Sequence, residues 1–203
     1  IDYDSSPHLD GDPDGTAQWK KGELPAYADE LFDPRYSDDL RGKMTDYYRE
    51  ISLGNLIVLG DYYPELIREK YSDIGTSPAA VMNRLSKRFK TDSAFVTKAG
   101  LTPPDFDFWQ RSPGQGLQKI LVTEGFEGVD HVMIIFRNYH RVPGDTGQTN
   151  LSSSIRIAGE RSNTYSMFGG GRRFPFGIMR HELNHLFLGG NNFHAGGGNG
   201  PVF

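Results

Sequence analysis

The stretch that most constrains this chain lies near its end, where the order His181-Glu182-x-x-His185 occurs. Two residues four apart on an α-helix lie on one face, about one turn apart, so both imidazoles can reach a single cation. Glu182 follows the first histidine directly and is therefore placed to accept a proton from an attacking water. The spacing requires a helix here and predicts a metal site with a carboxylate base beside it.

A third metal ligand has to come from outside this helix. A catalytic zinc takes three protein ligands and keeps one position open. His194, just past the pair Gly189-Gly190, is the nearest histidine after the motif, and the chain has no cysteine to supply a thiolate. Pro175 before the motif and the glycine pair after it are typical start and stop signals of a helix. We therefore predict a zinc site formed by His181, His185 and His194.

The context of this motif resembles the metzincin clan of zinc peptidases, in which the helix ends at a glycine and the chain turns back to offer a third ligand. A second segment, Met44-Thr-Asp-Tyr47-Tyr48-Arg-Glu-Ile-Ser52-Leu-Gly54, is similar to one found upstream of the active site in the immune inhibitor A family of secreted bacterial metallopeptidases. The resemblance covers most of residues 27–190. It implies an α+β, zincin-like fold, with a mixed twisted sheet packed on helices, and a secreted or extracellular bacterial metalloprotease.

The chain departs from the metzincin pattern in three ways. Leu188 stands where the clan has its glycine, and the glycines follow one and two residues later. The clan's third ligand falls on Asn191, which is a poor zinc ligand compared with histidine or a carboxylate. No Met-containing turn follows His194. We therefore expect a lengthened loop that delivers His194 to the metal.

Two functions from different classes are consistent with these residues. In the first, the chain is a zinc-dependent endopeptidase in which Glu182 is the general base and a protein or peptide is the substrate. In the second, it is a non-catalytic binding or adhesion module on a peptidase-like scaffold, with a structural or vestigial metal. The missing Met-turn favours the second function. The retained Glu182 favours the first, because a structural zinc has no use for a base, and the first is the one we expect.

Length and composition narrow the remaining choices. With 203 residues, 36% of them hydrophobic, the chain is expected to form a single catalytic domain over residues 1–203. A net charge of −4 with scattered basic residues argues against nucleic-acid binding. No stretch approaches the roughly 18 apolar residues that suggest a transmembrane helix. No signal peptide is visible, and a start at Ile1 is expected of a processed or trimmed form. The oligomeric state stays open.

Residues 1–25 are expected to be an acidic, irregular segment. Asp10, Asp12 and Asp14 alternate as in the first half of a calcium loop, with Gly15 at the sixth position. The twelfth position, which should be glutamate, is Lys21. We favour a solvated acidic turn, and a calcium site closed by distant ligands is the alternative.

Hydrophobic periodicity predicts the other elements. The run His131–Phe136 is apolar enough for a central strand covered on both faces. The strand Thr164–Phe168 is a candidate for pairing with an extended peptide substrate by edge addition. Tyr165 within it is expected to be a packed aromatic rather than an oxyanion ligand, and His131 is assigned no role. Helices are expected at Tyr27–Phe32, Leu40–Ile51, after Ser77-Pro78 and as one turn at Phe106–Trp109, and further strands at Asn55–Tyr63 and Ser152–Ala158.

Overall fold

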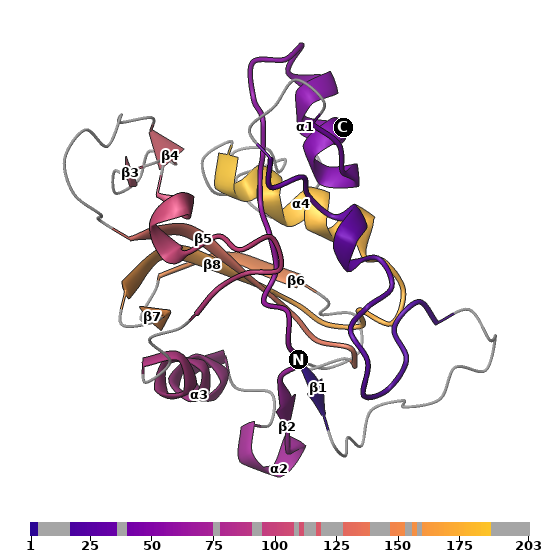
Figure 1. The fold of residues 1–203 in the computed structure, drawn as a ribbon, viewed down its shortest axis with the longest axis vertical. Coiled ribbons are helices and arrows are strands. Elements are labelled where there is room, and N and C mark those ends of the chain that lie inside the picture. The colour runs from indigo at the N-terminus through magenta and orange to yellow at the C-terminus, as the bar shows by residue number, and fades with distance from the viewer. Residues whose placement is uncertain are drawn as a thin grey trace, which may run out of the picture.

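The computed structural model describes residues 1–3, 17–35, 40–74, 78–90, 95–107, 110–111, 117–118, 128–138, 147–152, 156–157 and 160–187. Within them, a mixed sheet carries α4 on one face and α3 on the other, and α1 lies beyond α4 (Figure 1). The helices are η1 (Ala28–Glu30), α1 (Lys43–Ile51), α2 (Tyr71–Ile74), α3 (Pro78–Lys90), η2 (Pro103–Phe106) and α4 (Phe176–Phe187).

The main sheet has the strand order β5-β8-β6, so β8 lies in its middle. β8 pairs in parallel with β5, with Val129 opposite Ser162, and antiparallel with β6, with Gly147 opposite Phe168. The short β7 also pairs with β8. The strands are β1 (Asp2–Tyr3), β2 (Arg68–Glu69), β3 (Gln110–Arg111), β4 (Leu117–Gln118), β5 (Val129–Ile135), β6 (Gly147–Ser152), β7 (Arg156–Ile157) and β8 (Glu160–Phe168).

The ends of the predicted helices follow local signals. α1 ends at Ile51 with Ser52 as its C-cap, after which Leu53 and Gly54 both take positive φ angles, of 53° and 83°, that a helix cannot continue. Of the turn expected at Phe106–Trp109, Phe108 and Trp109 lie outside the described residues. The described turn is η2, where Thr102 and Asp105 form a reciprocal capping box at its start. The helix predicted after Pro78 is confirmed as α3. Tyr27–Phe32 contains only the single turn η1.

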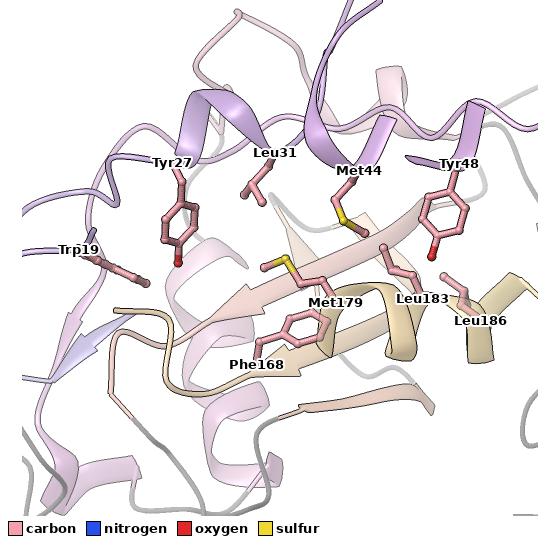
Figure 2. Packing of buried hydrophobic residues seen from close by; sticks show 9 residues of the cluster. All are labelled: Trp19, Tyr27, Leu31, Met44, Tyr48, Phe168, Met179, Leu183 and Leu186. Carbon is pink, nitrogen blue, oxygen red and sulfur yellow. The ribbon is translucent and has the colours of Figure 1, made fainter. Parts of the chain in front are cut away.

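Two hydrophobic clusters form the core, one on each face of the sheet. Successive side chains of β8 point to opposite faces of the sheet, so Met167 belongs to the first cluster and Phe168 to the second. The first cluster also contains Leu85 and Phe89 of α3. Figure 2 shows the second cluster, where side chains from α1 and the segment before it meet those of α4. Its members are Trp19, Tyr27, Leu31, Met44, Tyr48, Phe168, Met179, Leu183 and Leu186.

The prediction of a buried strand at Asn55–Tyr63 is wrong. The segment is irregular, and a cavity of about 1070 Å³ lies between it and β5. Its main-chain carbonyls are engaged by other parts of the chain: the Thr45 hydroxyl donates to the carbonyl of Val58 at 2.7 Å, and the amide of Lys98 donates to that of Tyr62 at 2.9 Å. These bonds hold the segment outside the sheet.

Two further strand predictions need correction. The run His131–Phe136 forms most of β5, but β8 and not β5 is the central strand of the described sheet. The strand Thr164–Phe168 lies within β8, whose two sides are already paired with β5 and β6, so it offers no edge to a peptide. Within the range Ser152–Ala158, where a strand was expected, Ser152 ends β6 and Arg156–Ile157 form β7. Both pair with β8, and the residues between them lie outside the described part of the chain.

Residues 1–3 of the N-terminal segment are buried, whereas residues 20–24 are exposed, as the acidic composition suggests. Asp2 and Tyr3 are buried in β1, and the Asp2 carboxylate accepts a hydrogen bond from buried Arg137 at 2.8 Å. Trp19 is also buried, at 2% exposure. Apolar contacts and one buried ion pair therefore hold the first residues of the chain in the core. The candidate calcium ligands Asp10, Asp12 and Asp14 lie outside the described residues.

The prediction that no helix crosses a membrane is confirmed for the part of the chain that the structure describes. None of its helices combines the length and the apolar character that a membrane span requires.

Candidate metal centre

The helix α4 is fixed in place by an apolar stripe on one of its faces. Met179, Leu183 and Leu186 recur at helical spacing and are exposed by at most 2%. They pack on the sheet and on α1, as Figure 2 shows. This burial leaves the histidine positions, 181 and 185, on an adjoining face of the same helix.

The geometry of this face suits a metal ion. The Nε2 atoms of His181 and His185 lie 3.2 Å apart. Two nitrogens bound tetrahedrally to one zinc at roughly 2.0–2.1 Å would lie about 3.3 Å apart. Without an ion, the same contact is a hydrogen bond from one ring to the other. Ligand atoms of His181, Glu182 and His185 all lie within 4.8 Å of one another, so this group could hold a metal ion.

The three side chains differ in their access to solvent. His181 is exposed, Glu182 is half-buried and His185 is buried. The two imidazoles meet nearly edge to face, with ring centroids 4.9 Å apart. The site therefore has one ligand fixed by packing and one at the surface, which leaves an approach from solvent beside the carboxylate.

The third predicted ligand, His194, lies outside the described residues, as do Leu188, Gly189, Gly190 and Asn191. Among the residues that are described, the group of potential ligands around α4 consists of His181, Glu182 and His185. Ligation by His194 therefore stays a prediction from the sequence.

Strand β6 passes unusually close to the carboxylate. A Cβ atom added to Gly147 would lie 2.5 Å from Cγ2 of Ile178 and 3.0 Å from Cγ of Glu182. Only a residue without a side chain lets the strand approach the helix so closely. The sequence analysis did not identify Gly147. From the sequence alone, this glycine resembles an ordinary turn residue, and its close approach to α4 is visible only in the structure.

Replacing Gly147 by alanine is expected to destabilise the fold by roughly 1–3 kcal/mol, because the new methyl overlaps Cγ2 of Ile178, whose χ1 rotamer is restricted within a helix. Gly177→Ala is the matched control, since a Cβ there meets nothing within 4 Å and alanine favours the helix by roughly 0.5–1 kcal/mol. Urea denaturation of both variants measures the difference. Equal stability of the two variants would contradict the close approach.

His131 lies in a polar network inside the sheet. Its Nδ1 lies 2.7 Å from the Thr164 hydroxyl, and its Nε2 lies 2.9 Å from that of Ser166. Burial lowers the pKa of His131 to about 3, so the ring is neutral near neutral pH. This is a structural histidine, and its two hydroxyl partners could be assigned only once β5 and β8 were paired.

Tyr165 is not part of the metal site. It is buried, with 6% exposure, in the core cluster that α3 covers, on the face of the sheet away from α4. The prediction that it is a packed aromatic is confirmed.

Comparison of the chain with protein-family models, with curated proteins and with solved structures yields no match. The zincin-like fold and the resemblance to the immune inhibitor A family therefore stay predictions from the sequence.

Proposed function

We propose that this protein is a zinc-dependent endopeptidase, with His181 and His185 as metal ligands and Glu182 as the general base. The observation that carries the proposal is the 3.2 Å separation of the two Nε2 atoms, which is close to the spacing of two ligands on one tetrahedral ion. The adjacent carboxylate supports a catalytic role, because a structural metal site needs no base. His194 is proposed as the third ligand.

In the proposed reaction, the histidines would hold the metal and Glu182 would transfer the proton. When bound, zinc would polarise the scissile carbonyl and make the attacking water more acidic. Glu182 takes the proton from that water and then delivers it to the leaving amine. Its half-buried position beside β6 restricts the motion of the side chain. Because His181 is exposed, a substrate can approach the site from solvent.

The proposed substrate and cellular location rest only on the resemblance to the immune inhibitor A family. We propose a protein or peptide substrate and a secreted, extracellular enzyme of bacterial origin. Cleavage of a denatured protein such as reduced casein, measured with and without a chelator, tests the proposal. Chelator-sensitive cleavage that returns with added zinc supports it. Bound zinc without any cleavage would instead identify a binding module with a structural metal.

The third ligand can be tested separately. His194→Ala is expected to lower zinc affinity by about 10-fold or more, since it removes one of three protein ligands. Zinc content after gel filtration, measured by elemental analysis, gives the result. His140→Ala is a matched control, as this histidine is assigned no role. Unchanged zinc content in His194→Ala would move the third ligand to another residue.

A further inference from the structure

The hydroxyl of Tyr48 connects α1 to the motif helix. It donates toward Oδ1 of Asn184 at 3.1 Å and lies 3.3 Å from the main-chain oxygen of Arg180. Tyr48 is 1% exposed, and burial raises its pKa, so the hydroxyl keeps its proton at any physiological pH. The ring descends from α1 toward α4 beside Leu183 and Leu186 (Figure 2).

The neighbouring tyrosine contacts the same face of α4 in a different way. The Arg180 guanidinium lies 5.0 Å from the ring centroid of Tyr47 and 4.7 Å from that of Phe176. The rings of Tyr47 and Tyr48 pack edge to face at 5.0 Å, so each limits the motion of the other. Two successive residues of α1 thus hold positions 180 and 184, one turn apart on α4.

These contacts determine how α4 is rotated about its own axis. Arg180 and Asn184 share one face, and His181 and His185 each follow by one residue, which is about 100° around a helix. Holding the first pair against α1 therefore fixes the direction in which the histidine pair points. The apolar stripe alone fixes the rotation less specifically, because hydrophobic contacts are non-directional.

We infer that Tyr48 is a positioning residue for the metal centre: its hydroxyl fixes the rotation of α4, and with it the direction of His181 and His185. The inference rests on the proposed function, because it assigns Tyr48 a role in the same site. Tyr48 acts through Asn184 and Arg180 and touches neither ligand in the contacts described above. Its place in the second core cluster therefore accounts for only part of its role.

The test compares two tyrosine-to-phenylalanine variants. Tyr48→Phe removes the hydroxyl that contacts α4. Tyr27→Phe removes an equally buried hydroxyl, which donates to the carbonyl of Gly171 at 2.7 Å, outside α4. We expect the zinc dissociation constant, measured by competition with a chromophoric chelator, to rise about 10-fold in Tyr48→Phe. It should change less than about 2-fold in Tyr27→Phe. Equal effects in both variants would reduce Tyr48 to an ordinary core residue.

A second measurement does not require metal. In the metal-free protein, amide hydrogen exchange at Asn184 and His185 should be severalfold faster in Tyr48→Phe than in Tyr27→Phe. If the wild-type protein binds no zinc, the proposed function fails but this difference is still expected. If zinc binds and the two variants exchange at the same rate, the positioning role fails and the proposed function survives.

Discussion

Glu182→Gln is expected to lower kcat/KM for peptide hydrolysis by about 10²–10⁴-fold while the protein keeps its zinc. The amide has nearly the same size and shape as the carboxylate but cannot take a proton from water. Because the new side chain fills the same space beside Gly147, the substitution is expected to leave the fold and both histidine ligands in place. Initial rates on a fluorogenic peptide, together with zinc content, give the result.

The control for this experiment is Glu50→Gln. Glu50 is an exposed residue of α1, so its substitution removes one negative charge without altering the site. Its activity should equal that of the wild-type protein. Normal hydrolysis by Glu182→Gln would exclude Glu182 as the general base. Loss of zinc along with activity would instead make Glu182 a ligand.

The motif helix could be predicted because every signal that defines it is local. The start, the spacing of the histidines and the buried stripe of Met179, Leu183 and Leu186 all follow from positions along one helix. The same is true of α1, whose end at Ser52 and Gly54 follows from backbone preference. Local periodicity therefore identified two histidines and a glutamate that the structure brings within 4.8 Å of one another.

The arrangement of the strands could not be predicted in the same way. The run Asn55–Tyr63 is as apolar as a buried strand, but side-chain and main-chain donors from Thr45 and Lys98 hold it outside the sheet. Such competition depends on contacts between residues distant in sequence, which periodicity does not report. The position of Thr164–Phe168 was wrong for a related reason, because central and edge strands differ in their neighbours and not in their own pattern.

Between pH 6.5 and 4.5, His131 is expected to contribute to the pH dependence of stability. Burial lowers its folded-state pKa from the ordinary value of 6.5 to about 3, so in this interval the unfolded chain binds a proton that the folded protein does not. The stabilisation from the neutral ring is complete above pH 6.5. It is lost as the pH falls, at up to about 1.4 kcal/mol per pH unit. Urea denaturation between pH 6.5 and 4.5 measures this slope.

Two variants separate protonation of His131 from loss of its hydrogen bonds. His131→Gln removes the titrating group, so the slope between pH 6.5 and 4.5 should fall by up to about 1.4 kcal/mol per unit. Thr164→Val removes the hydroxyl 2.7 Å from Nδ1 but keeps the histidine, so it should lower stability by a similar amount at every pH and keep the slope. Asp33 does not interfere, because the Arg35 side chain lowers its pKa and its titration falls below this interval. An unchanged slope in His131→Gln would show that His131 protonates without unfolding the protein.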